Sequence, residues 1–252
     1  MELTKMVSTR TRPFDARLYA LDRNTNQFRH RCKALEVYLS LSDDFEALLP
    51  FPLTPSTIPP VGLIGLSNYL SSNVRPYLEQ YSGIQVRDPA GEIGYYIPHI
   101  YVSANDNAVL PGHAALGLPT TVAGIRLFRV GGLVQGTLER PHGTRLLTIS
   151  ARPSTHINVT SSGLTQTVYY SVCHSTPGFD PGRQHTPRLV KWRTSRFLRS
   201  DECGHTMSFT GPFSLSYGSS AVKYPVFRIG VDHMILGLYQ EYDFRLEEIS
   251  MF

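Results

Sequence analysis

Short stretches in which apolar and polar residues alternate recur along almost the whole chain, and helical periodicity is nearly absent. The clearest pair, Arg126–Val130 and Leu133–Arg140, is joined by Gly131-Gly132 as a hairpin. Comparable stretches lie at 31–40, 61–66, 91–103, 145–151, 165–173, 188–198, 206–217, 225–231 and 234–244. Because successive side chains of a strand point to opposite faces, this pattern is typical of half-buried strands. The sequence therefore predicts a mostly-β (α+β) fold, a barrel or a sandwich.

Few other elements interrupt these strands. Ser42–Pro50 has a serine cap, an acidic first turn and a proline stop, which predicts a short helix. Residues 1–28 are polar and irregular, and we expect an N-terminal arm there. With no internal repeat and no linker, residues 29–252 are expected to form a single domain.

The composition is that of a globular protein and restricts its partners. Hydrophobic residues make up 41% and charged residues 17% of 252 residues, enough chain to bury a core. The net charge is +4, and arginines are concentrated at 183–199. The alternation through Leu189–Arg193 indicates a strand with an arginine-rich outer face, which disfavours nucleic-acid binding. No apolar run is long enough to span a membrane, and no secretion signal is visible. We expect a cytoplasmic protein with no nucleic-acid or membrane partner.

The cysteines and histidines form no familiar metal motif. Cys32, Cys173 and Cys203 are far apart, and the sequence has no CxxC, HxH or HExxH spacing. It also lacks the GxSxG, P-loop and GxGxxG patterns. We therefore expect no structural zinc, no disulfide framework and no cofactor.

Two adjacent threonines, Thr120 and Thr121, follow Pro119 where a small-residue turn passes into a strand. Proline restricts the residue before it and fixes its own φ, so the chain enters this strand at a defined angle. The β-propensity of threonine accounts for both residues without any function.

Several stretches, in order along the chain, resemble the acetoacetate decarboxylase family. VYLSLSDDFEALLPFPL resembles the strand and helix before that family's LLPxPL turn, and GYYIPHIYV resembles its IPV strand. GHAALGLPTTVAGIRL resembles GREIWGFPKKLAKIRL, GLVQGTLER resembles VxGTVER, and FTGPFSLSY resembles WTGPxxLxL. The resemblance covers Phe28 to Phe244 and implies a cone-shaped β-barrel with an internal pocket, commonly in homo-oligomers.

The resemblance also implies what chemistry is missing. In that family a lysine of the PKK motif forms a Schiff base with a keto acid, helped by a depressed pKa. Thr120 and Thr121 stand where the two lysines would be, and threonine cannot form an imine. The decarboxylation chemistry of the family is therefore expected to be absent.

Two other positions of the implied pocket, Arg31 and Glu92, keep polar residues. The resemblance aligns Arg31 with a substrate-carboxylate arginine and Glu92 with a catalytic glutamate. Ile64 replaces a second glutamate, and His113 and Ala114 replace the arginine and glutamate of GRE. We expect Arg31 and Glu92 to face one cavity, where Glu92 transfers protons and Arg31 binds a planar oxyanion. A chemically idle ion pair between the two is the alternative.

Thr120, Thr121, Tyr96 and His113 complete the expected substrate-binding set. Strand parity lets only one of the threonines point inward, where it would orient a carbonyl or hydroxyl group. Tyr96 either donates to an oxyanion or fills the barrel. His113 is either a proton shuttle or an ordinary loop histidine.

Three functions follow as hypotheses. The first is a lysine-independent enzyme that isomerises, dehydrates or cyclises an enolisable, polyketide-like molecule, with pericyclic closure included. The second is a non-catalytic small-molecule-binding barrel. The third is an imine-forming decarboxylase whose lysine has moved to Lys33.

Overall fold

A closed barrel of seven strands forms the body of the protein. The computed structural model describes residues 30–71, 76–103, 119–157, 164–173, 188–224, 227 and 230–251. Its elements are β1 (His30–Leu41), η1 (Asp43–Leu48), β2 (Thr54–Pro55), β3 (Val61–Ser71), β4 (Tyr77–Arg87), β5 (Ile93–Ser103), β6 (Thr120–Val130), β7 (Leu133–Glu139), β8 (Arg145–Ala151), β9 (Thr155–His156), β10 (Leu164–Cys173), β11 (Arg188–Leu198), β12 (Ser208–Thr210), β13 (Phe213–Tyr217), η2 (Ser219–Lys223) and β14 (Val231–Met251). The η elements are 3-10 helices.

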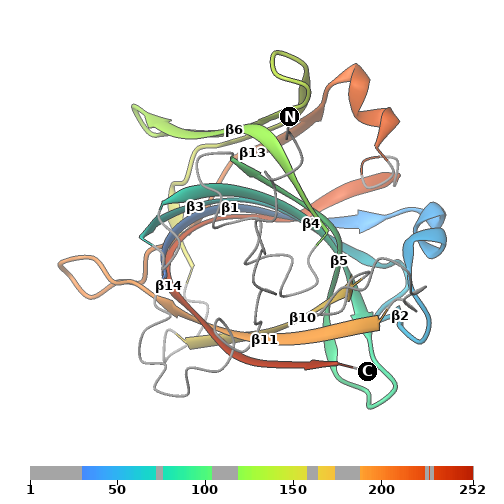
Figure 1. The fold of residues 1–252 in the computed structure, drawn as a ribbon. Helices are drawn as coiled ribbons and strands as arrows, with labels where there is room; N and C mark the ends of the chain where they lie inside the picture. The colour runs from blue at the N-terminus through green and yellow to red at the C-terminus, as the bar shows by residue number, and fades with distance from the viewer. Residues whose placement is uncertain are drawn as a thin grey trace, which may run out of the picture.

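The barrel closes in the order β1, β3, β4, β5, β10, β11, β14 and back to β1. One edge of β5 pairs with two strands: Tyr95 and Tyr96 pair with β10, whereas Ile100–Ser103 pair with β6. From β6 the sheet continues through β7 and β8 to β13, and this extension lies over β1 and β3 (Figure 1). The extension thus forms a second layer on the outside of the barrel.

The two faces of the barrel wall carry different side chains. On β1, the apolar Leu35, Val37 and Leu39 face outward and share a core with side chains of β7 and β8. The intervening Glu36 and Tyr38 face the barrel interior, where a separate cluster includes Trp192. The main apolar core therefore lies between the layers, and the interior is rich in tyrosine and in ionisable groups.

The strand pattern is largely confirmed. β8 and β11 have the predicted bounds, and β1, β3, β5, β7 and β10 begin or end within a few residues of theirs, although β3 runs on to Ser71. β4 was not predicted, and Ser42–Pro50 forms a 3-10 helix rather than an α-helix. The expected N-terminal arm lies outside the described residues. Among the described residues, no helix is both long and apolar enough to cross a membrane.

Gly65 provides the first test of this arrangement, because a Cβ at this position would collide with the ring of Tyr81. We expect Gly65→Ala to lower the free energy of unfolding by about 1–3 kcal/mol, the usual cost of overpacking. Urea unfolding measures this change. Gly124→Ala is the matched control, because a Cβ there meets only Glu139 at ordinary contact distance, 3.6 Å. Equal stability of the two variants would contradict the packing of Tyr81 over β3.

Candidate active site

A buried ion pair crosses the interior of the barrel. Arg196 of β11 donates from Nη1 to Glu36 Oε1 at 2.7 Å and from Nη2 to the Tyr169 hydroxyl at 2.7 Å. Tyr81 of β4 donates its hydroxyl to the same Glu36 oxygen, and the Arg196 guanidinium lies over the ring of Tyr242, 4.8 Å from its centroid. These side chains come from β1, β4, β10, β11 and β14, so they connect most of the barrel wall through its centre.

The pair is fully desolvated. Glu36 is 0% and Arg196 7% exposed. Burial works against the charged guanidinium, but Glu36 and the surrounding tyrosines raise the pKa of Arg196 well above its usual value. Burial, with the Glu36 charge next, also raises the pKa of Tyr81. The Arg196 guanidinium therefore stays charged, and its ion pair with Glu36 crosses the barrel interior.

Two nitrogen donors beside the ion pair, Nε of Arg196 and the indole N–H of Trp192, have no hydrogen-bond partner among the described residues. Trp192 stacks on Tyr169 with ring centroids 4.4 Å apart, and Tyr169 in turn contacts Arg196. Buried donors normally have partners. Two unpaired donors on one inner surface are consistent with a site that receives an acceptor group.

Glu79 is a second carboxyl group on the inner face of β4, two residues from Tyr81. It is 8% exposed, and desolvation raises its pKa to about 8, although a hydrogen bond with Tyr77 lowers it. At neutral pH this carboxyl is therefore largely protonated. A neutral carboxylic acid in an apolar site can both donate and, near its pKa, accept a proton.

Thr120 lies on the same face of the sheet as these groups. Paired residues of neighbouring strands share a face. Tyr81 pairs with Ile100, which pairs with Thr120, while Glu79 pairs with Val102 in the adjacent row. Thr120 therefore faces the barrel interior, and Thr121, opposite Tyr101, faces the outer core.

The structure does not bring Arg31 and Glu92 together, which corrects the expected shared cavity. Arg31 is an exposed residue on the outer face of β1, level with Ser71, and its backbone N–H donates to Ser71 Oγ at 3.4 Å. Glu92 lies just before β5, at the opposite end of the barrel, where β4 ends at Arg87. Strand parity on β1 was correct, but Arg31 shares the outward face of Leu35 rather than an inward one.

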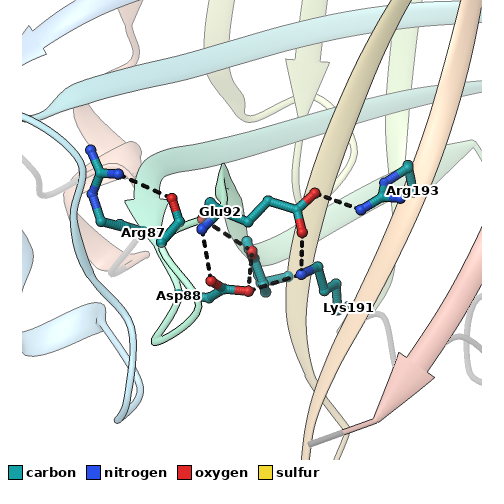
Figure 2. A network of polar contacts seen from close by, with 7 residues as sticks. Arg87, Asp88, Glu92, Lys191 and Arg193 are labelled. Atoms are coloured by element: carbon teal, nitrogen blue, oxygen red, sulfur yellow. Dashed lines mark hydrogen bonds and ion pairs between the residues drawn. The ribbon is translucent and has the colours of Figure 1, made fainter.

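Glu92 belongs to a charge cluster on the outer surface of the barrel (Figure 2). Its Oε2 lies 2.5 Å from Lys191 Nζ and its Oε1 2.6 Å from Arg193 Nη2, while Lys191 also contacts Asp88 Oδ2 at 2.9 Å. The hydrogen bond from Lys191, against a smaller effect of desolvation, lowers the pKa of Glu92. A carboxylate held by two cations in this way is a poor proton acceptor.

Two other predicted positions, Tyr96 and Ile64, also lie away from the interior. Tyr96 is buried in the outer core, and burial raises its pKa. Ile64 packs in the same outer core. His113 and Ala114 lie outside the described residues.

The described lysines all lie outside the barrel interior. Lys33 is on the outer face of β1, with Nζ 2.9 Å from Glu241 Oε1. Lys191 belongs to the Glu92 cluster, and Lys223 ends η2 as an exposed residue. Lys5 is outside the described residues. Within the part of the chain that the structure describes, the interior has no amine that could form an imine.

Sequence reasoning missed Glu36, Glu79 and Arg196. The alternation over 31–40 places Glu36 on the strand face opposite to that of Leu35 and Val37. A charged residue among the small and aromatic residues of that face was the available signal. Glu79 lies on β4, whose polar sequence YLEQYSGIQVR gives no strand signal. Arg196 lies on the predicted strand 188–198, for which the alternation through Leu189–Arg193 indicated only an arginine-rich outer face.

The raised pKa of Glu79 predicts a pH-dependent stability. Because the folded state binds this proton more tightly than an unfolded chain with a pKa near 4.5, the stabilisation is complete below pH 4.5 and is lost as the pH rises to about 8. Glu79→Gln should remove a slope of up to about 1.4 kcal/mol per pH unit between these values. Urea unfolding from pH 5 to 8 measures it.

Glu92→Gln is the control for that measurement. The pKa of Glu92 is lowered, so its contribution to stability changes only in more acidic solution. The wild-type slope should persist in Glu92→Gln between pH 5 and 8. A Glu79→Gln profile parallel to that of the wild type would show that Glu79 is already ionised inside the barrel.

Known structures share this fold. The chain is 17% identical to the acetoacetate decarboxylase of Legionella pneumophila, with a TM-score of 0.73 over 89% of this chain and 86% of that one. It is 19% identical to an acetoacetate decarboxylase-like enzyme from Sphingomonas wittichii, with a TM-score of 0.65 over 89% and 92% of the two chains. The enduracididine biosynthesis enzyme MppR, solved with the condensation product of pyruvate and imidazole 4-carboxaldehyde, is 15% identical, with a TM-score of 0.66 over 89% and 88%.

No curated protein matched the sequence. At these identities the structural matches establish the fold alone. The sequence model of the acetoacetate decarboxylase family, however, matches residues 13–252. That match spans the whole barrel and its second layer, and the chain therefore belongs to the acetoacetate decarboxylase family.

Proposed function

We propose that this chain is a lysine-independent enzyme of the acetoacetate decarboxylase family that moves a proton on an enolisable small molecule bound inside the barrel. Isomerisation, dehydration and cyclisation of a polyketide-like substrate all fall within this chemistry. The observation that carries the proposal is the protonated, buried Glu79 on the same inner face as Thr120, with the described lysines all outside.

The interior side chains divide the work between them. Glu79 is the general acid and base, because its raised pKa keeps a transferable proton near neutral pH. The Thr120 hydroxyl orients the reacting carbonyl. The unpaired Arg196 Nε and Trp192 N–H offer hydrogen bonds to an oxygen on which negative charge develops.

The family's solved relatives support substrates of this kind. MppR was solved with a condensation product of pyruvate, an enolisable 2-oxo acid. Pyruvate is therefore a reasonable probe for this chain. That this chain assembles into a homo-oligomer stays a prediction from the family resemblance.

Borohydride trapping tests whether an imine forms. We expect no mass increase when the protein is treated with borohydride and pyruvate or acetoacetate, because Lys33, Lys191 and Lys223 all lie outside the interior. Intact mass spectrometry measures the result. A stable adduct that peptide mapping places on Lys33 would instead support a decarboxylase with a relocated lysine.

Deuterium exchange tests the proton transfer itself. In D₂O the wild-type protein should incorporate deuterium at the methyl carbon of pyruvate, followed by NMR, faster than buffer alone. Glu79→Gln should lower the rate by about 10²–10⁴-fold, as expected for loss of a general base. Glu92→Gln alters only the charge cluster on the outer surface, so it should keep the wild-type rate of deuterium exchange.

The same assay separates the competing functions. Loss of exchange in Glu92→Gln but not in Glu79→Gln would restore the site expected from the sequence. Saturable binding of pyruvate or acetoacetate without any exchange, decarboxylation or other turnover would favour a non-catalytic binding barrel.

A further inference from the structure

A compact group of side chains with metal-binding atoms lies on the loop between β11 and β12, away from the barrel interior. Asp201, Cys203 and His205 occupy alternate positions of this loop, which projects from the barrel beside β14 (Figure 1). Their candidate ligand atoms all lie within 4.8 Å of one another. Ligand atoms around a tetrahedral zinc ion lie about 3.5 Å from one another, so these three atoms need to move only slightly closer to hold an ion.

The backbone holds this loop in a tight turn. Ser200 and Thr206 form an isolated β-bridge, the Asp201 N–H donates to the His205 carbonyl at 2.9 Å, and Gly204 takes a φ of +82°. Asp201 Oδ1 accepts the N–H groups of Cys203 and His205, both at 2.9 Å. The other carboxylate oxygen, Oδ2, lies 3.4 Å from His205 Nδ1 and is the Asp201 atom left to bind a metal ion.

A second histidine lies beside His205 on a different strand. The ring of His156, on β9, lies 5.5 Å from that of His205 between centroids, across the pairing of β9 with β12. His156 Nδ1 lies 3.3 Å from the Thr206 carbonyl oxygen, and because a carbonyl only accepts, Nδ1 carries the proton. Histidines that bind metal commonly donate the other ring N–H to a backbone carbonyl in this way.

We propose that Asp201, Cys203, His205 and His156 bind a divalent transition-metal ion, best matched by Zn²⁺. A thiolate, two imidazoles and one carboxylate form a four-ligand tetrahedral set of the type that zinc prefers, and the thiolate disfavours Mg²⁺ and Ca²⁺. The sequence excluded structural zinc because it lacks CxxC and HExxH. This group has neither spacing, since its fourth ligand comes from β9.

The bound ion would tie β9 to the connection between β11 and β12. β9 is two residues long and pairs with β12, which in turn pairs with β14 of the barrel wall. The site is separate from the interior groups proposed for catalysis, so the two proposals fail independently.

Cobalt titration tests the site directly. Co²⁺ is added to the full chain in a phosphine reductant, because thiol reductants would bind the metal. We expect one Co²⁺ to bind per chain, with visible absorption bands as intense as those of tetrahedral Co²⁺ and a near-ultraviolet thiolate-to-cobalt charge-transfer band. Added Zn²⁺ should displace the Co²⁺. Cys203→Ser should abolish the charge-transfer band, and His156→Ala should keep it while weakening Co²⁺ binding at least about tenfold.

Matched variants control for other ligands. Cys32→Ser removes a buried thiol of the barrel interior, and His142→Ala removes an exposed histidine from the turn between β7 and β8. Both should give the wild-type spectrum. The proposal is overturned if wild-type protein shows no charge-transfer band, if the band survives in Cys203→Ser, or if His156→Ala binds Co²⁺ with unchanged affinity.

Discussion

The divided edge of β5 is the constraint on which the rest of this structure depends. Two residue pairs with β10 close the barrel, and from Ile100 onward the same edge accepts β6. Because a strand edge can pair with only one neighbour at each position, β10 and β6 must separate there. This division creates the second layer, which buries the apolar face of β1 and β3, and it leaves the start of β6 facing the barrel interior.

The pairing of β5 with β10 is only two residue pairs long and needs support from other contacts. The cluster of Asp88, Glu92, Lys191 and Arg193 crosses β10 on the outer surface and joins the β4–β5 turn to β11 (Figure 2). Tyr170 adds its hydroxyl to Asp88 Oδ2 at 3.1 Å. Inside the barrel, Tyr169 and Arg196 join the same strands through a hydrogen bond. Polar contacts on both faces thus reinforce the place where the backbone pairing is shortest.

The sequence predicted the strands with apolar alternation and missed the strand without it. β8 and β11 alternate cleanly and were predicted with correct bounds. β4 presents Glu79 and Tyr81 inward and buries Gln80 and Ser82 on its other face, so its polar residues resemble a loop although most are buried. A strand whose two faces both bury polar groups has no signature in hydrophobic periodicity, because its partners come from distant strands. Glu79, the proposed proton-transfer group, was missed for the same reason that β4 was.

The sequence contains one tryptophan, and it stands in the middle of this interior. Trp192 stacks on Tyr169, whose hydroxyl accepts from the arginine of the buried ion pair. Its indole N–H has no partner among the described residues. The tryptophan fluorescence of the protein therefore originates beside the proposed site, and a guest molecule, a displaced tyrosine or an admitted water would each change its emission without any attached label.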